Sequence, residues 1–167
     1  ELKGNLSHAL EPAEYAELID AAFVHLKDKY GIVPDALEII LEPDNSEHWR
    51  GRQIGEAIGA TVARLRAKGL SPQIIAPSTA AAGKAPAYFD EMIAVPGVSS
   101  LVTTLSYHRY DSPRSTVVKG IAETARALGL SNRLVDRAMP VPGIAERARE
   151  HRISTAMLEH LSGDAAE

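Results

Sequence analysis

Two of the glutamates in this sequence stand at the end of an apolar run. Glu42 follows Ile39–Leu41, and Glu159 follows the run from Ile153 to Leu158. An apolar run that stops at polar residues is typical of a buried strand that opens into a loop. Two carboxyls at such strand ends can divide the work of cleaving a glycosidic bond, because a protonated one donates its proton while an ionised one attacks. The alternative is that each glutamate caps the following helix or pairs with an arginine.

A third apolar run ends in "SYHRY", which contains His108 and Tyr110. Because successive side chains of a strand point to opposite faces, these two should lie on one side and Arg109 on the other. There they can hydrogen-bond the hydroxyls of a substrate or hold Glu159 in its ionised form. The alternative is that they are ordinary loop residues.

The only tryptophan, Trp49, lies a few residues beyond Glu42. An aromatic side chain on such a loop can stack against a sugar ring. The alternative is that Trp49 packs at the start of the next helix as a hydrophobic staple. His108 and His160, together with an acidic residue, are the candidates for a metal site, but the sequence favours a reaction that uses no metal and no cofactor.

The elements that must position these residues alternate between strand and helix. The apolar runs predict strands near residues 37–42, 73–77, 100–107 and 153–158. Amphipathic periodicity predicts helices between them, after Pro12 and over residues 50–68, 85–95, 115–128 and 143–151. This alternation favours an α/β fold with parallel strands, either an open doubly wound sheet or a (β/α)8 barrel. Both architectures place functional residues at the carboxyl ends of the strands, and in a barrel these ends converge.

Composition narrows the class of protein. The chain has 167 residues and a net charge of −4, with acidic and basic residues interspersed, so a nucleic-acid partner is not expected. No apolar run approaches the ~18–20 residues that span a bilayer. The absence of cysteine excludes disulfides and thiolate metal sites, and it fits a cytoplasmic protein as well as a secreted or periplasmic bacterial one. No glycine-rich phosphate loop follows any predicted strand, which disfavours nucleotide binding.

Four segments together resemble the second half of the clan-A retaining glycoside hydrolases, especially those of families 30 and 39. In chain order they are "LEPDN", "IIAPS", "LSYHRY" and "TAMLEH". The resemblance implies a (β/α)8 barrel and a carbohydrate substrate. It implies that Glu42, at the end of the fourth barrel strand, is the general acid/base, and that Glu159, at the end of the seventh, is the nucleophile. It also implies that Tyr110 or His108 supports Glu159.

The sequence departs from the clan in one residue and in extent. Leu41 stands where the clan has an asparagine that binds the sugar 2-hydroxyl, and Asn45 is the nearby residue that can replace it. The resemblance corresponds only to strands four to seven, so residues 1–167 are expected to form a single domain that is half of a barrel. The chain begins at Glu1, which fits removal of a leader or trimming of a longer chain. Because a half-barrel has open strand edges, we expect self-association or a need for the missing segments.

Two other functions fit the same segments. One is a non-catalytic carbohydrate-binding or assembly protein with the barrel outline. The other is an α/β hydrolase or esterase, which the sequence disfavours because it contains no G-x-S-x-G motif.

Overall fold

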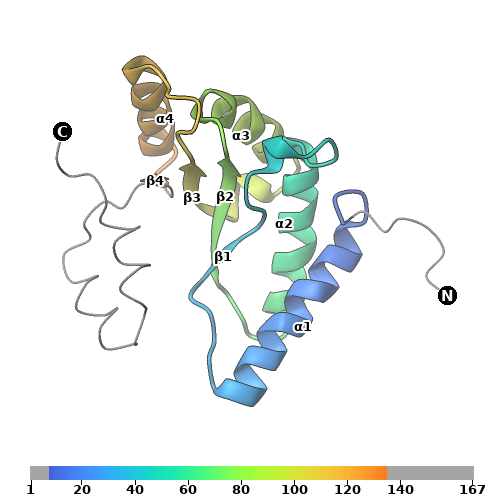
Figure 1. Ribbon diagram of the computed structural model, residues 1–167. Helices are drawn as coiled ribbons and strands as arrows, with labels where there is room; N and C mark the ends of the chain where they lie inside the picture. Colours follow the sequence, from blue (N-terminus) through green and yellow to red (C-terminus); the bar gives the residue numbers. More distant parts are fainter. Residues whose placement is uncertain (1–7, 135–167) are drawn as a thin grey trace, which may run out of the picture. The chain divides into compact units, whose positions relative to one another are not determined.

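The computed structural model describes residues 8–134, which form a parallel sheet flanked by helices (Figure 1). The sheet contains four strands in the order β1-β2-β3-β4: β1 (Ala36–Glu38), β2 (Gln73–Thr79), β3 (Val102–Tyr107) and β4 (Ser131–Leu134). All three neighbouring pairs are parallel. This sequential order is that of a barrel segment, and it has none of the reversal that a doubly wound sheet requires. The predicted α/β fold with a partial barrel is confirmed.

The helices are α1 (Pro12–Tyr30), α2 (Gly51–Arg66), α3 (Ala85–Ile93) and α4 (Ser115–Ala127), and the short 3-10 turns are η1 (Pro43–Asn45), η2 (Ala82–Lys84) and η3 (Val98–Ser100). Three of the helices, α2, α3 and α4, connect consecutive strands, whereas α1 precedes β1 and packs against α2 (Figure 1). Pro12 occupies the first turn of α1, and Gly31 ends that helix with a φ of 67°. The four helices predicted within residues 8–134 are therefore confirmed, with ends that differ by a few residues.

The strand predicted at residues 37–42 is shorter in the structure. β1 ends at Glu38, although the chain continues beside β2, since the Ile39 N–H donates to the Ile75 carbonyl over 3.3 Å. Leu41, the last residue of the apolar run before Glu42, is 59% exposed. The apolar run therefore predicted correctly that this segment lies in the sheet, but it predicted too long a strand.

β4 was not predicted, because Ser131–Leu134 contains no apolar run. The predicted helix 143–151, the predicted strand 153–158 and Glu159 lie outside the described residues. The described residues belong to one compact unit that ends at Leu134. The single domain of residues 1–167 therefore stays a prediction.

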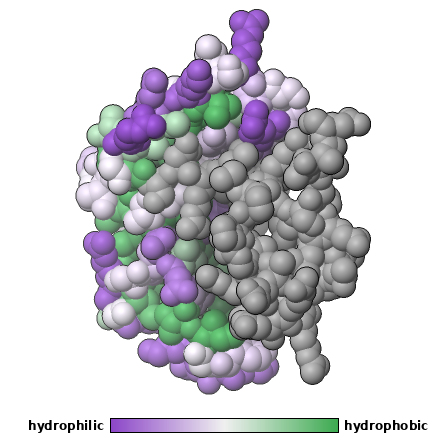
Figure 2. Space-filling view, turned by 90° about the vertical axis from the view of Figure 1, so that its left-hand side faces the viewer, coloured by the Kyte–Doolittle hydropathy of each residue, from purple (hydrophilic) through white to green (hydrophobic). Residues whose placement is uncertain are grey.

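The core forms where α2 packs on the sheet. Its apolar stripe, which the sequence predicted, is buried at Ile54, Ile58, Val62 and Leu65. Ile54 and Ile58 belong to one cluster of buried residues with Ile74 of β2 and Leu105 of β3. On the face shown in Figure 2, by contrast, hydrophobic and hydrophilic residues are interspersed over the described part. No helix within residues 8–134 is long and apolar enough to cross a membrane.

α2 and α3 approach each other at two glycines of α2. A Cβ atom on Gly55 would lie 2.6 Å from the Met92 carbonyl oxygen and 2.7 Å from Cγ2 of Val95, whereas a Cβ atom on Gly59 would meet nothing within 4 Å. Gly51 is similarly close to Tyr88. The contact between α2 and α3 therefore depends on glycine at two positions and not at the third.

We expect Gly55→Ala to lower the free energy of unfolding by about 1–3 kcal/mol, because the added methyl group overpacks a backbone contact. Gly59→Ala is the matched control, and it should raise the free energy of unfolding by about 0.5–1 kcal/mol, because alanine restricts the unfolded chain at an open helical position. Urea unfolding followed by circular dichroism measures both. Changes of the same sign and size in the two variants would contradict this packing.

A buried carboxylate joins α1 to α2. Asp20 is 4% exposed, and its Oδ2 lies 2.7 Å from the Lys68 Nζ and 3.1 Å from the Arg64 Nε. The hydrogen bond from Lys68 lowers the pKa of Asp20, desolvation opposes this, and Arg64 lowers the pKa further. The ionised carboxylate is therefore the form that stabilises the fold.

Since the pKa of Asp20 is lower in the folded than in the unfolded chain, its stabilisation is present above the unfolded pKa of about 3.9 and is lost as the pH falls through the folded value. We expect Asp20→Asn to be less stable than the wild type at pH 7 and the difference to shrink below about pH 4. Urea unfolding at several pH values tests this. Glu17→Gln is the control. The Glu17 side chain is 62% exposed and its Oε2 is 3.7 Å from an Arg64 nitrogen, so its removal should change the free energy of unfolding little at any pH. A difference for Asp20→Asn that does not depend on pH would contradict the assignment.

Candidate active site

Glu42 lies at the point where the chain leaves the sheet and begins η1. Its φ is 51°, in the left-handed region that residues other than glycine seldom adopt. The backbone around it is fixed from both sides, since its N–H donates to the Ser78 carbonyl over 2.9 Å and its carbonyl accepts from the Asn45 N–H over 3.0 Å. The position of Glu42 is therefore set by the end of β2 and by the turn that follows.

The Glu42 carboxyl contacts two other residues that the sequence singled out. Its Oε1 lies 2.8 Å from Nδ1 of His108, and its Oε2 accepts a hydrogen bond of 2.8 Å from Nδ2 of Asn45. The His108 side chain is 5% exposed and the Glu42 side chain 24% exposed. The structure thus brings three predicted site residues together from loops that are 66 residues apart.

The contact between Glu42 and His108 can hold a proton in either of two ways. When the carboxyl is ionised, Nδ1–H donates to it, and when the carboxyl is protonated, it donates to Nδ1. Asn45 donates to the other oxygen, which fixes the rotation of the carboxyl group. Such a carboxyl, held in one orientation and open to solvent on one side, can act as a general acid and base.

His108 follows the last residue of β3, and its N–H donates to the Thr79 carbonyl over 2.7 Å. Its Nε2 is buried and has no hydrogen-bond partner within residues 8–134. The rings of His108 and Tyr110 meet edge to face, with their centroids 5.5 Å apart. The sequence offered His108 as support for Glu159, whereas the structure places it on Glu42.

Trp49 packs toward the core. Its ring meets that of Tyr15 at a centroid distance of 5.6 Å, and its carbonyl accepts a hydrogen bond from the Tyr88 hydroxyl. Tyr15 is buried, its hydroxyl donates to the Ile39 carbonyl, and desolvation raises its pKa to about 12. These contacts fit the staple at the start of α2, and the role of Trp49 in sugar binding stays a prediction.

Several residues around the site were not predicted. Ser78 and Ser106 are fully buried, and their hydroxyl oxygens are 2.6 Å apart. Asp44 and Asp111 bond to the backbone that follows β2. An aspartate in a short Pro- or Ser-containing loop commonly binds backbone N–H groups, and this signal could have identified both aspartates.

Backbone strain gathers at the same edge of the sheet. Within residues 8–134, the residues other than glycine that have a positive φ are Glu42, Ser78 and Ser112. They follow β1, lie near the end of β2 and follow β3, respectively. Strained residues cluster at functional sites, where the surrounding structure holds them in place. The distribution of strain therefore marks the same edge as the polar contacts do.

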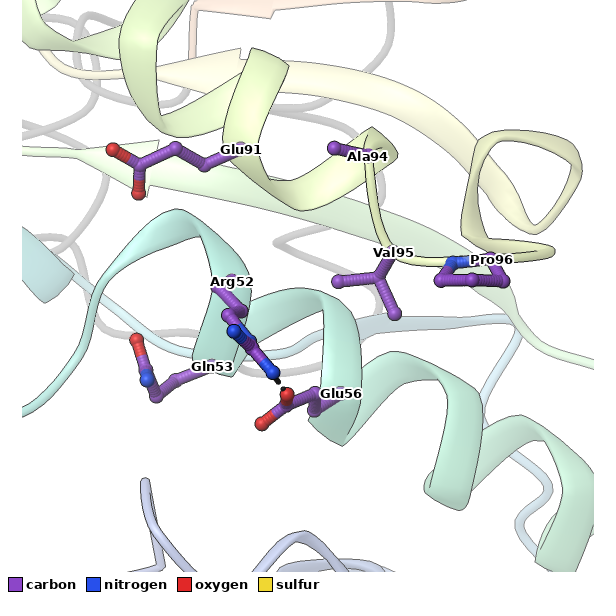
Figure 3. A pocket seen from close by; sticks show the side chains of 7 residues that line it. All are labelled: Arg52, Gln53, Glu56, Glu91, Ala94, Val95 and Pro96. Atoms are coloured by element: carbon purple, nitrogen blue, oxygen red, sulfur yellow. Dashed lines mark hydrogen bonds and ion pairs between the residues drawn. The ribbon is translucent and has the colours of Figure 1, made fainter.

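A pocket of about 540 Å³ lies elsewhere, in the helical layer (Figure 3). Arg52, Gln53 and Glu56 of α2 line one side of it, and Glu91 and Ala94, with the Val95-Pro96 segment, line the other. It contains none of the predicted site residues. Among residues 8–134, no group of three or more histidines or acidic residues is arranged to hold a metal ion.

Searches by sequence found neither a matching family model nor a matching curated protein. Solved structures with a similar fold include two xylanases. One is a glycoside hydrolase family 30 subfamily 8 xylanase from Clostridium acetobutylicum, with a TM-score of 0.56 and 22% identity, and the match covers 85% of this chain and 36% of that one. The other is the catalytic domain of a GH30 xylanase C from Talaromyces cellulolyticus, with a TM-score of 0.52 and 19% identity, and the match covers 60% of this chain and 24% of that one.

The chain therefore corresponds to roughly a quarter to a third of the length of these xylanases. At such low identity the likeness concerns the fold alone. It agrees with the resemblance that the four sequence segments predicted. The described residues have the fold of a part of the barrel of family-30 glycoside hydrolases.

Proposed function

We propose that this protein is a glycoside hydrolase that cleaves O-glycosidic bonds by a retaining mechanism with two glutamates. The observation that carries the proposal is the half-buried Glu42 carboxyl, held by His108 and Asn45 at the carboxyl end of parallel strands. The fold of family-30 glycoside hydrolases supports it, because barrels of this kind place their reacting groups at that end.

In the proposed reaction Glu42 is the acid/base and Glu159 the nucleophile. Glu159 attacks the anomeric carbon while Glu42 gives its proton to the departing glycosidic oxygen, and a glycosyl ester forms on Glu159. Glu42, now ionised, then takes a proton from water, which attacks the same carbon and releases the sugar from Glu159. The mechanism requires the two carboxyls to lie about 5–5.5 Å apart.

The residues around Glu42 then have distinct roles. His108 and Asn45 orient the Glu42 carboxyl, and the Asn45 amide can also reach a sugar hydroxyl. Because His108 is engaged with Glu42, the proposal leaves Tyr110 as the residue that supports Glu159. Trp49 is the proposed stacking surface for a sugar ring. Since both similar structures are xylanases, a xylan is the first natural substrate to assay.

Substitution of the two glutamates should reduce hydrolysis in different ways. Glu159→Gln should abolish turnover of every substrate, because an amide cannot form the ester intermediate. Glu42→Gln should slow hydrolysis of a xylan by about 10²–10⁴-fold, yet largely spare formation of the glycosyl ester from an activated aryl glycoside, whose leaving group needs little protonation. Steady-state and burst kinetics on both substrates measure this difference.

Glu47→Gln is the matched control, since Glu47 is an exposed glutamate in the same loop as Glu42, and it should retain activity. If Glu42→Gln and Glu159→Gln lose the same activity on both the xylan and the aryl glycoside, the proposed division of roles is ruled out. Carboxyls of Glu42 and Glu159 more than about 10 Å apart in an experimental structure would rule out any two-carboxylate mechanism.

A non-catalytic carbohydrate-binding protein is the second candidate. The observation that favours it is Leu41, an aliphatic side chain that is 59% exposed beside Glu42, at the place where the clan has a substrate-binding asparagine. Xylan oligosaccharides that bind but are never cleaved, with binding unaffected by Glu159→Gln, would favour this second candidate.

Self-association is part of the proposal, because β1 and β4 each pair on one side only within residues 8–134. An open parallel edge presents unpaired N–H and carbonyl groups to another chain. We expect the weight-average mass to rise with protein concentration in sedimentation equilibrium. A stable monomer over a hundredfold range of concentration would contradict this expectation.

A further inference from the structure

The loop between β2 and α3 is bound by two carboxylates from its two neighbouring loops. Asp44 accepts from the Ala80 N–H with Oδ1 over 2.6 Å and from the Ala81 N–H with Oδ2 over 3.2 Å. Asp111 accepts from the Ala82 N–H over 3.1 Å and from the Gly83 N–H over 2.9 Å. Four consecutive backbone N–H groups are thus shared between one aspartate that follows β1 and one that follows β3.

Both aspartates stand close in sequence to a residue of the candidate site. Asp44 is the second residue after Glu42, and Asp111 is the third residue after His108. Their main chains bond to the end of β2, just before this loop, since the Glu42 N–H donates to the Ser78 carbonyl and the His108 N–H to the Thr79 carbonyl. Each of the two site residues is therefore held twice, through its own backbone at the end of β2 and through an aspartate at the loop that follows.

The hydrogen bonds that these carboxylates accept are charge-assisted and therefore strong. A charged acceptor roughly doubles the strength of a hydrogen bond from a backbone N–H group. The Asp44 side chain is 2% exposed, and its Oδ2 is 3.4 Å from the Lys84 Nζ. Gly83 lets Asp111 approach closely, because a Cβ atom there would lie 3.1 Å from its Oδ2. An ordinary cap would hold its own loop, whereas these two carboxylates reach across to a different one.

We propose that Asp44 and Asp111 are positioning residues, which set the Glu42 carboxyl against the His108 imidazole by binding the loop of residues 80–83 from both sides. The catalytic consequence of this clamp rests on the proposed function, but the geometric consequence does not. If either carboxylate loses its loop bonds, the loop that carries Glu42 or His108 is free to shift, and the 2.8 Å contact between them is lost.

The first measurement follows the His108 imidazole in the 15N-labelled full chain. Its two nitrogen resonances are assigned by their absence in His108→Gln, and Glu42→Gln gives their positions without the carboxylate. Asp44→Asn and Asp111→Asn each replace one acceptor oxygen with an N–H donor that faces a backbone N–H. We expect both variants to move the His108 resonances toward the positions seen in Glu42→Gln.

Two controls separate positioning from general damage and from charge. Gly55→Ala destabilises the fold between α2 and α3 and should keep the wild-type His108 resonances. Lys84→Gln changes the charge beside Asp44 but leaves the backbone bonds in place, and it should also keep them. Gly83→Ala displaces the Asp111 carboxylate without altering any charge, so it should reproduce the direction of the Asp111→Asn change even where an aspartate variant folds poorly.

The second measurement is hydrolysis. Asp44→Asn and Asp111→Asn should lower kcat on a xylan by about 10²-fold, the order of loss that a displacement of about 1 Å causes, and should lower it less on an activated aryl glycoside. If Asp44→Asn and Asp111→Asn fold and leave the His108 resonances unchanged, the two aspartates do not position Glu42 against His108. The proposal is also overturned if Glu42→Gln itself leaves the His108 resonances unchanged. A wild-type chain without activity would refute the proposed function, while the resonances would still decide the clamp.

Discussion

The end of β2 is the part of the sheet on which the candidate site depends. The adjacent carbonyls of Ser78 and Thr79 accept hydrogen bonds from the backbone N–H groups of Glu42 and His108. These two residues belong to the segments that follow β1 and β3, on either side of β2. Because these two carbonyls are consecutive, Glu42 and His108 reach the same level of the sheet. Their side chains then meet over 2.8 Å. A sheet with another strand order would not place these two segments on opposite sides of the same strand.

Most polar groups at the ends of β2 and β3 and in the loop after β2 are paired within the protein itself. The buried hydroxyls of Ser78 and Ser106 bond to each other, and the N–H groups of the loop after β2 are taken up by Asp44 and Asp111. The buried Nε2 of His108 differs, because it has no partner within the described residues. One buried oxygen each of Asp20, Glu38, Gln53 and Thr61 is also without a partner there, and His108 is set apart from these by the Glu42 carboxyl on the other nitrogen of its ring.

The sequence predicted the parallel sheet and the edge at which Glu42 and His108 meet, because apolar runs that end in polar residues carry both kinds of information. It did not predict their contact, since periodicity gives the side of a strand but not the register between strands. Register depends here on irregularities between β2 and β3, at Ile74/Ile75 and Pro77/Thr79. β1 was predicted too long because an apolar run does not reveal a left-handed residue at its end, and β4 was missed because its residues are largely polar.

The conformation of Glu42 bears on why a glutamate stands where the chain leaves the sheet. A left-handed φ of 51° costs a residue with a Cβ roughly 1–3 kcal/mol, and glycine would avoid that cost. Glutamate gains in return only the contacts of its carboxyl, which are with His108 and Asn45. The His108 side chain is 5% exposed and the Glu42 side chain 24% exposed, so both groups have lost hydration, and this loss opposes the gain from their contact. A strained glutamate held against a buried histidine is the arrangement that the proposed role of Glu42 in proton transfer requires at this edge of the sheet.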